Sequence, residues 1–516
     1  MEEVAIAFVG FMGAGKSNAA RAVARRLGEQ AVDADEELER DLGESIASFF
    51  EREGEPAFRE REEAATLDLL SRGGVLSLGG GAVESERVRR ALRGHVTAWC
   101  RVDEEVAWER SRDTTRPLAV DREEFRARYR DRLPLYEKVA RAVLPEGGAD
   151  GPGAAAPWLA SLRDRPDVRL AWAHSATGAY PAAIGPGAIG FFDAPATADA
   201  LGVSRWFAIA DAEAVDRHRD VLPPCEAVVE VDAAEERKTL AEAERVLRAL
   251  AAAGARRDDG VIAFGGGMVG DLAGFCAASY QRGIPVVQVP TTLVAQVDSA
   301  YGGKTGVDLP EAKNYVGAYH MPAAVLADPR LLETLPDAEL AAGFAEVLKT
   351  GLIAGGELWE RVRELDRLEP AGLTDVIFAC ARTKIDVVAG DERDQGSRAV
   401  LNLGHTVGHA IEAATGYARY RHGEAVGLGL LATLRLSDAD RLRAEVRMIL
   451  ERRGLPTALD SGIGTDEVVA AIELDKKRTA EGVGFVLLDG PGEPRTGVAV
   501  DPERVRAAVD ELAAEG

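Results

Sequence analysis

Lysine, asparagine and cysteine are scarce in this chain of 516 residues. Only nine of its 62 basic residues are lysines, and asparagine occurs three times. The four cysteines are scattered without the spacing of a metal site, which favours reduced, buried thiols in a cytoplasmic protein over a disulfide framework. No apolar run reaches the roughly 20 residues that a membrane span requires, so a membrane is not an expected partner.

An excess of basic charge is also missing. The formal net charge is −24, which repels nucleic acid and acidic lipid, so neither is an expected partner. If the substrates are anionic small molecules, basic side chains must be concentrated inside the sites. The first ten residues are acidic and then briefly apolar, which predicts a buried strand rather than a signal peptide.

The length and the residue pattern predict several domains. Residues 4–9 and 75–78 have the apolar, β-branched pattern of strands, and residues 16–27 have the pattern of a helix. A Gly-, Pro- and Ala-rich stretch at 145–157 lacks periodicity. We therefore expect a separately folding first domain at 1–150 and a linker at 151–165.

The rest of the chain divides into two parts by pattern. Strand, glycine turn and helix alternate from about residue 166 to residue 328, which predicts an α/β part. Residues 329–516 are mostly helical in pattern, and a ligand site is expected between the two parts. The expected helices of the last part include 338–354, 373–389, 405–415 and 424–439.

A phosphate-binding loop follows the first predicted strand. The segment Gly10-Phe-Met-Gly-Ala-Gly15-Lys16-Ser17 fits G-x-x-x-x-G-K-[ST] and opens a predicted helix. Backbone N–H groups of such a loop surround phosphates, the lysine reaches the β and γ oxygens, and the serine hydroxyl ligates Mg²⁺. The alternative is a structural glycine turn that binds no nucleotide. The expected ATP contacts are Gly13, Ala14, Gly15, Lys16 and Ser17.

Over residues 1–145 the chain resembles shikimate kinases. The resemblance depends on an ordered set of short motifs, because each motif alone is weak. The motifs are Val32-Asp33-Ala-Asp35, Phe58-Arg59, Ser77-Leu-Gly-Gly-Gly81-Ala, Thr115-Arg116-Pro117-Leu118 and Arg132-Leu-Pro-Leu-Tyr136.

The resemblance implies a role for each matched residue. Asp33 would lie near Mg²⁺, and Asp35 would hold substrate hydroxyls and could act as the base. Two guanidinium groups suit a carboxylate, although each arginine alone could be a solvated surface charge. Asn18 stands where the family has threonine. Arg59 and Arg132 would clamp the shikimate carboxylate, Gly80 and Gly81 would approach the ring, and Arg116 would close onto ATP.

Two further patterns lie in the second half of the chain. A Gly-rich turn, Phe264-Gly-Gly-Gly267-Met-Val-Gly270-Asp271, follows a predicted strand and would let a pyrophosphate approach the backbone, although a tight packed turn would look the same. His405 and His409 lie four residues apart on one predicted helix face. That spacing alone suggests that both bind one metal ion, and the alternative is a satisfied core histidine.

From about residue 180 to near its end the chain resembles 3-dehydroquinate synthases. Many short motifs recur in the family's order. They are Glu235-Glu-Arg-Lys238, Gly265–Asp271, Arg282-Gly283, Pro290-Thr-Thr-Leu293, Asp298, Gly302-Gly-Lys304, Lys313-Asn314, Glu346-Val-Leu-Lys349, Lys384, Arg398, Leu401-Asn402-Leu-Gly-His405-Thr-Val-Gly-His409, His422-Gly423-Glu424 and Asp475-Lys-Lys477.

This second resemblance implies a metal site and an NAD⁺ site. Glu346, His405 and His422 would bind Zn²⁺ or Co²⁺, which leaves His409 for proton transfer. Lys304 and Arg398 would also be catalytic. The NAD⁺ contacts would be Glu235, Lys238, Gly265, Gly266, Gly267, Asp271, Thr291, Thr292 and Lys313. The substrate contacts would be Arg282, Asp298, Lys304, Asn314, Lys349, Lys384, Arg398, Asn402, His409 and Lys476.

The scarce lysines support an anionic substrate for this second site. Lys304, Lys313, Lys349, Lys384 and Arg398 would form a basic pocket for a phosphate and a carboxylate, which a neutral polyol substrate would not need. Asp308 departs from the asparagine that is common in the family, and it adds a negative charge near the pocket.

The sequence therefore predicts a bifunctional enzyme with α/β architecture. Its kinase domain would have a P-loop and a parallel sheet, followed by a Rossmann-like NAD-binding part and a mainly α-helical metal-binding part. By resemblance, the kinase transfers the γ-phosphate of ATP, with Mg²⁺, to shikimate. The synthase converts 3-deoxy-D-arabino-heptulosonate 7-phosphate to 3-dehydroquinate and phosphate without consuming NAD⁺, and it would form a homodimer. The alternatives are a cyclase for another heptulose phosphate and a regulatory protein with one inactive domain.

Overall fold

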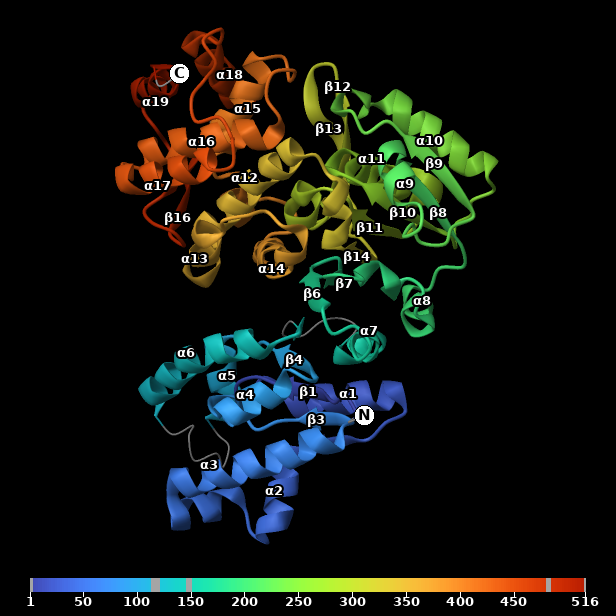
Figure 1. The fold of residues 1–516 in the computed structure, drawn as a ribbon, viewed down its shortest axis with the longest axis vertical. Coiled ribbons are helices and arrows are strands. Elements are labelled where there is room, and N and C mark those ends of the chain that lie inside the picture. The colour runs from blue at the N-terminus through green and yellow to red at the C-terminus, as the bar shows by residue number, and fades with distance from the viewer. Residues whose placement is uncertain (1–2, 113–120, 145–150, 479–483, 515–516) are drawn as a thin grey trace. The chain divides into compact units, whose positions relative to one another are not determined.

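The computed structural model describes residues 3–112, 121–144, 151–478 and 484–514, without the side chains of 475–478. Residues 1–203 and 204–516 form two compact units, which are described separately (Figure 1). Within the described residues, no helix is both long enough and apolar enough to span a membrane. All four cysteines are free, and Cys100, Cys276 and Cys380 are buried.

The first unit is built on a sheet in the order β2-β3-β1-β4-β5-β6-β7. Its strands run parallel from β2 to β6, and β6 and β7 form an antiparallel hairpin. The central strand β1 is fully buried because all of its residues are apolar. The strands are β1 (Ile6–Val9), β2 (Ala31–Asp33), β3 (Val75–Ser77), β4 (Val96–Cys100), β5 (Ala142–Leu144), β6 (Arg169–Ser175) and β7 (Gly178–Ile184).

Helices surround this sheet, and α2 and α3 form a lobe at its side, visible in dark and mid blue in Figure 1. Helix α1 buries an alanine- and valine-rich face and ends at Gly28, which has a left-handed φ of 72°. The helices are α1 (Lys16–Leu27), α2 (Ala34–Leu42), α3 (Ile46–Arg72), α4 (Glu86–Leu92), α5 (Glu104–Ser111), α6 (Arg122–Val139), α7 (Ala156–Leu162) and α8 (Pro195–Leu201).

The segment predicted as a linker is ordered and packed. Residues 152–155 form a 3-10 turn, and α7 follows it directly. Trp158, Leu159 and Leu162 of α7 are at most 2% exposed. Arg163 donates two hydrogen bonds to Glu29, beside the end of α1, at 2.7 and 3.0 Å. The first compact unit thus runs to Val203, beyond the predicted domain end at residue 150.

We expect the fragment 1–203 to be more stable than the fragment 1–150. Full burial of one large apolar side chain is worth about 1.5–3 kcal/mol, so loss of α7 should lower the unfolding free energy by roughly 4 kcal/mol or more. Urea unfolding of both fragments measures this difference, and Trp158→Ala in the longer fragment should reproduce part of it. Equal stability of the two fragments would show that the packing of α7 does not stabilise the P-loop domain.

The second unit begins with a parallel sheet in the order β14-β11-β10-β8-β9. One face of this sheet packs on α10 and α11 and forms a core of Val, Ile, Leu and Ala side chains. Hairpin β12–β13 packs on α11. The strands are β8 (Trp206–Asp211), β9 (Ala227–Val231), β10 (Gly260–Gly265), β11 (Val286–Pro290), β12 (Lys304–Leu309), β13 (Ala312–Tyr319) and β14 (Ala324–Ala327), and the helices are α9 (Ala212–His218), α10 (Leu240–Ala252) and α11 (Gly267–Ser279).

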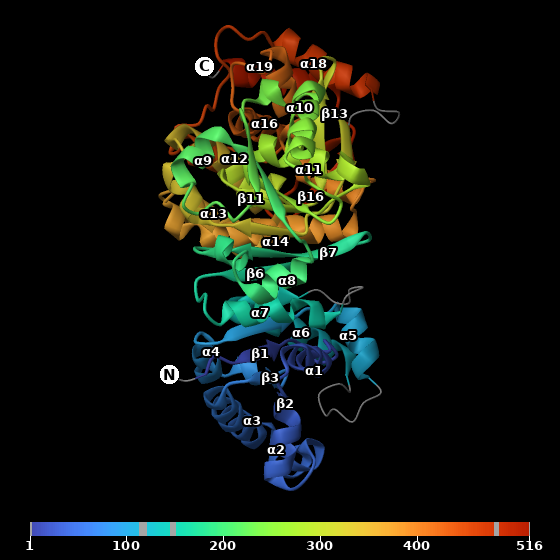
Figure 2. The ribbon, with the colours of Figure 1, turned by 90° about the vertical axis from the view of Figure 1, so that its right-hand side faces the viewer.

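The rest of the second unit is helical, as predicted. Figure 2 shows α18 and α19 together at one end of this unit, and α16 contacts α12, α15, α17 and α19. The four helices expected here are present, with bounds shifted by three residues or fewer. They and their neighbours are α12 (Asp337–Ala354), α13 (Gly356–Glu364), α14 (Thr374–Gly390), α15 (His405–Ala414), α16 (His422–Leu436), α17 (Asp440–Glu451), α18 (Thr465–Arg478), hairpin β15 (Phe485–Leu488) and β16 (Pro494–Val498), and α19 (Pro502–Ala514).

Candidate active sites

The phosphate-binding loop joins β1 to α1. Gly10 approaches β4 so closely that an added Cβ would lie 2.5 Å from the Cys100 carbonyl oxygen. Gly15 caps α1 with a left-handed φ of 79°, a conformation that favours glycine. Because α1 begins at Lys16, its first N–H groups face this loop, as anion binding requires. A cavity of about 420 Å³ lies here.

The polar side chains of Lys16, Ser17, Asn18 and Arg110 line this cavity. Lys16 Nζ donates to the Phe11 carbonyl oxygen at 3.2 Å, and Ser17 Oγ lies 3.3 Å from Ser77 Oγ. Arg110, which the sequence reading missed, lines the cavity and donates to the Gly13 carbonyl oxygen at 3.2 Å. No short motif marks Arg110, because it reaches the loop only through the packing of α5.

The two predicted aspartates lie where β2 passes into α2. Asp33 caps α2 and accepts the backbone N–H of Asp35 at 3.1 Å. Asp35 lines a second cavity together with Arg59, Arg132, Gly80 and Gly81. The structure thus brings the predicted substrate residues of the kinase together.

Carboxylates that the sequence did not predict contact the arginine clamp, among them Glu62 and Glu84. Glu62, three residues after Arg59 on α3, lies 2.6 Å from it. Burial raises the pKa of Glu62, and Arg59 opposes this shift. Glu84 accepts from Arg132 Nε and Nη2 at 3.0 and 3.1 Å. The spacing from Arg59 to Glu62 was a usable signal, since residues three apart share a helix face.

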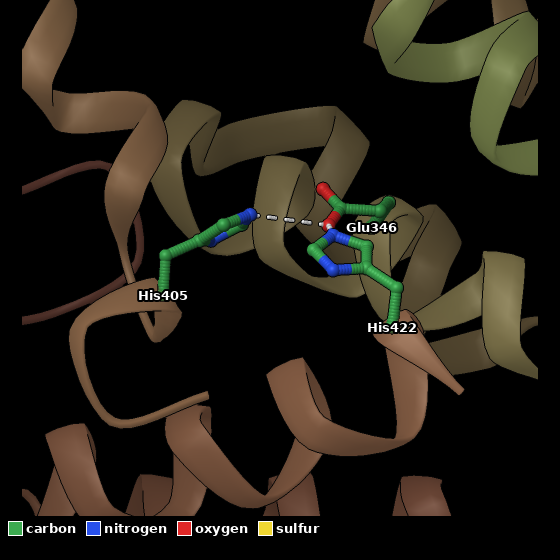
Figure 3. A group of neighbouring side chains, drawn as sticks. All are labelled: Glu346, His405 and His422. Atoms are coloured by element: carbon green, nitrogen blue, oxygen red, sulfur yellow. Dashed lines mark hydrogen bonds and ion pairs between the residues drawn. The ribbon is translucent and has the colours of Figure 1, made fainter. Parts of the chain in front are cut away.

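In the second unit, three predicted metal ligands converge (Figure 3). Glu346 on α12 is 1% exposed, and its Oε1 lies 3.2 Å from His422 Nε2 and 3.4 Å from His405 Nε2. Both histidines are the first residues of their helices, so the two helix starts meet at α12. One carboxylate and two imidazoles are a ligand set for a catalytic divalent metal.

The protonation of these groups reflects their surroundings. Burial, helped by Lys349, lowers the pKa of His405 to about 3. Burial acts in the same direction on His422, but hydrogen bonds to Glu346 and Glu412 raise its pKa to about 10. Lys349 Nζ, 2.5 Å from Glu346 Oε2, holds the pKa of that carboxyl well below its usual range against the effect of burial. Glu346 is therefore a buried anion that faces the two imidazoles.

His409 lies one helical turn after His405. It is exposed, and its ring centre is 5.1 Å from that of His405 and 6.0 Å from that of His422. Glu412, a residue that the sequence reading missed, lies 3.5 Å from His422 Nδ1 and is 5% exposed. Its position seven residues after His405, on the same face of α15, was the available signal.

The predicted basic residues lie in several groups. Lys384 and Lys349 face Asp298, at 2.9 and 3.7 Å. Buried Arg398 donates to the carbonyl oxygens of Gly302 and Glu392. Lys304 is half exposed and pairs with Asp394 at 2.5 Å.

Lys313 has different partners from these cations. It stands over the Tyr417 ring at 4.2 Å, with Glu412 at 3.8 Å. The lysines and their carboxylate partners nevertheless come from both the α/β part and the helical part. Asp298 and Lys304 precede residue 329, whereas Lys349, Lys384 and Asp394 follow it.

The Gly-rich turn connects β10 to α11. An added Cβ at Gly266 would lie 2.9 Å from Thr292, and one at Gly267 would lie 3.0 Å from Ser299. Gly265 accepts the backbone N–H of Thr291 at 3.0 Å. The predicted cofactor residues of these two segments are therefore neighbours.

Lys238 is the centre of a buried charge cluster beside this turn. Its Nζ lies 3.0 Å from Glu235 and 3.3 Å from Asp271, and it donates to Asn314 at 2.8 Å. Burial raises the pKa of Asp271 to about 6, although Lys238 opposes the shift. Asp308, the family departure, accepts the Asn314 backbone N–H at 2.6 Å and so holds the end of hairpin β12–β13.

Four predicted site residues are either exposed or outside the described part of the chain. Arg282 and Asn402 are exposed. Arg116 lies outside the described residues, and so does the side chain of Lys476 on α18. Their assignments stay predictions.

The fold and these sites define a class of protein. A P-loop domain is joined to a unit that combines a glycine turn suited to a dinucleotide with a Glu/His/His cluster suited to a metal ion. Family comparisons agree with this description. Residues 12–155 match the shikimate kinase family, residues 228–342 match the 3-dehydroquinate synthase N-terminal family, and residues 343–478 match the 3-dehydroquinate synthase C-terminal family.

The chain is 44% identical over 295 residues to a 3-dehydroquinate synthase of Gloeobacter violaceus, covering 55% of this chain and 81% of that protein. It belongs to the 3-dehydroquinate synthase family and carries a shikimate kinase domain before it. The predicted fusion of a kinase and a lyase of the shikimate pathway is confirmed.

Solved structures resemble the synthase part. A 2-deoxy-scyllo-inosose synthase complexed with carbaglucose-6-phosphate, NAD⁺ and Co²⁺ is 25% identical, with a TM-score of 0.60, covering 66% of this chain and 99% of that chain. The 2-epi-5-epi-valiolone synthase of Streptomyces hygroscopicus subsp. jinggangensis, with NAD⁺ and Zn²⁺ bound, is 27% identical, with a TM-score of 0.58, covering 65% of this chain and 97% of that chain.

Proposed function

We propose that the two sites catalyse two separate reactions. The first site transfers the γ-phosphate of ATP to shikimate, and the second cyclises 3-deoxy-D-arabino-heptulosonate 7-phosphate to 3-dehydroquinate with release of phosphate. The Glu346–His405–His422 cluster, with its buried carboxylate, carries the second assignment. The chain is 44% identical to the 3-dehydroquinate synthase but only 25% and 27% identical to the 2-deoxy-scyllo-inosose and 2-epi-5-epi-valiolone synthases, which supports this substrate over another sugar phosphate.

In the kinase, each proposed role follows from position. Lys16 and the N–H groups at the start of α1 bind the ATP phosphates, and Ser17 on α1 and Asp33 at the start of α2 hold Mg²⁺. Asp35, which faces the cavity beside Gly80 and Gly81, accepts the proton of the shikimate hydroxyl. The guanidinium groups of Arg59 and Arg132 bind the shikimate carboxylate.

In the synthase, the donor set fits a divalent metal ion. The three ligand atoms lie within 4.8 Å of one another and combine a buried anionic oxygen with two imidazole nitrogens, which suits Zn²⁺ or Co²⁺. The ion would supply a Lewis acid, and NAD⁺ at the β10–α11 turn would supply a hydride acceptor. His409 moves a proton at its ring nitrogen, and Lys349, Lys384 and Arg398 bind the anionic groups of the substrate.

Three further assignments belong to this proposal. The synthase consists of an NAD-binding part at 166–328 and a metal- and substrate-binding part at 329–516. Two copies associate through the synthase half, and the protein works in the cytoplasm. Sedimentation of the full chain tests the association.

Removal of the metal tests the proposal. We expect dialysis against EDTA, followed by addition of Mg²⁺ alone, to abolish phosphate release from the heptulosonate phosphate. ADP release with shikimate should return to its original rate, because the P-loop site needs only Mg²⁺. Zn²⁺ or Co²⁺ should restore phosphate release. Phosphate release that survives chelation, in a protein shown to be free of Zn²⁺ and Co²⁺, would contradict the metal assignment.

A further inference from the structure

The two arginines of the kinase clamp already share a carboxylate of this chain. Glu84 accepts from Arg132 Nε and Nη2 at 3.0 and 3.1 Å, and its Oε2 lies 3.4 Å from Arg59 Nη2. One carboxylate thus contacts both guanidinium groups, which is the arrangement proposed for the carboxylate of shikimate. Arg132 is 2% exposed, so few other directions of approach to it remain.

Two further glutamates contact the clamp and would also compete with a substrate carboxylate for Arg59. Arg59 also pairs with Glu62 at 2.6 Å and with Glu55 at 3.0 Å. Three glutamates of this chain therefore contact the two clamp arginines in the absence of substrate. The hydrogen-bonding edge of Arg132 that would hold a carboxylate in bidentate fashion is occupied by Glu84.

The position of Glu84 allows it to leave. It ends the short turn of residues 82–84, directly after the glycine run, and its side chain is 39% exposed, whereas the side chain of Glu62 is 7% exposed. Arg89 holds the turn through hydrogen bonds to the carbonyl oxygens of Val83 and Glu84. A rotation of the Glu84 side chain into solvent would therefore free Arg132 without movement of the backbone.

We propose that Glu84 is an internal competitor for the substrate carboxylate. Its side chain occupies the clamp in the free enzyme and must be displaced when shikimate binds, so Glu84 sets the KM for shikimate. This inference rests on the proposed function of the kinase site. In the absence of substrate, the ion pairs of Glu84 stabilise the two clamp arginines. The same ion pairs must be broken when shikimate binds, so they weaken its binding.

Steady-state kinetics of Glu84→Gln test the inference. We expect the KM for shikimate to fall by about threefold to tenfold, with kcat and the KM for ATP unchanged, because a partly exposed ion pair contributes modestly. Glu63→Gln is the matched control, since Glu63 also lies on the kinase surface and pairs with Arg87 and Ser85 instead of the clamp. Its KM for shikimate should equal that of the wild type.

Glu84→Asp separates contact from long-range repulsion, because it keeps the charge on a side chain that is too short to reach both arginines. The proposal expects a lowered KM for this variant as well. An unchanged or raised KM in Glu84→Gln, or a lowered KM in Glu84→Gln alone, would overturn it. Thermal unfolding confirms that each variant is folded. If the wild type does not phosphorylate shikimate, the proposed function fails instead.

Discussion

Lys16→Ala is expected to abolish shikimate phosphorylation and to leave the synthase at its wild-type rate. Lys16 is 9% exposed and is the first residue of α1, so its ammonium group is held beside the loop that binds the phosphates. Loss of a charge that contacts the transferred group costs several kcal/mol of transition-state stabilisation, on the order of 10³-fold or more in kcat. ADP release with saturating shikimate measures the loss.

Lys138→Ala is the matched control for this prediction. Lys138 is an exposed lysine in the last turn of α6, in the same unit. Its replacement removes the same charge from the same domain, and the kinase rate should stay within about twofold of the wild type. A kinase that keeps more than a tenth of its activity in Lys16→Ala would contradict the assignment of this loop.

His422→Ala is expected to lose both the bound metal ion and synthase activity. His409→Ala is expected to keep the metal ion at one per chain and to lose turnover, by about 10²- to 10⁴-fold, the usual contribution of a general acid or base. The reason is geometric. His422 Nε2 lies 3.2 Å from the buried Glu346 carboxylate, whereas His409 is exposed and groups instead with Glu412 and His422.

Elemental analysis of each purified variant measures the metal content, and phosphate release measures turnover. His218→Ala is the control, since His218 lies on α9 and contacts Thr334 away from the cluster. Metal retained at one per chain in His422→Ala, or lost in His409→Ala, would restore the simpler reading in which His405 and His409 are the paired ligands.

Much of the fold could be predicted because local pattern and tertiary structure agree. The P-loop helix begins and ends at Lys16 and Leu27, as its glycines and apolar spacing indicate. The helical metal-binding part follows from long apolar repeats such as 338–354. In each case the signal lies within a single element and needs no knowledge of its neighbours.

The packed helix α7 could not be predicted in this way. Its sequence is short and lies beside glycines, prolines and alanines, which indicate a linker on composition alone. Trp158 stacks on Phe191 at 5.3 Å, and Arg163 reaches Glu29, 134 residues earlier. Contacts between residues so far apart in the sequence determine the structure of this segment. They produce no pattern in the local sequence from which the helix could be predicted.

The same reasoning explains which site residues were missed. The predicted ligands and lysines lie in short sequence motifs. Glu84 and Glu412 lie in no such motif, and they are recognised only by their contacts with Arg132 and His422 in the folded chain. In a chain with 86 acidic residues, a carboxylate carries almost no signal of its own. A scarce residue is more informative, and eight of the nine lysines lie in the motifs of the two sites.

The central claim is that one chain holds two independent active sites. Paired assays on a single preparation test it most directly, with ADP release in the presence of shikimate and phosphate release from the heptulosonate phosphate with NAD⁺. The wild type should show both activities, Lys16→Ala only the second and His422→Ala only the first. A folded wild-type protein that lacks either activity, or a single variant that loses both, would contradict the account.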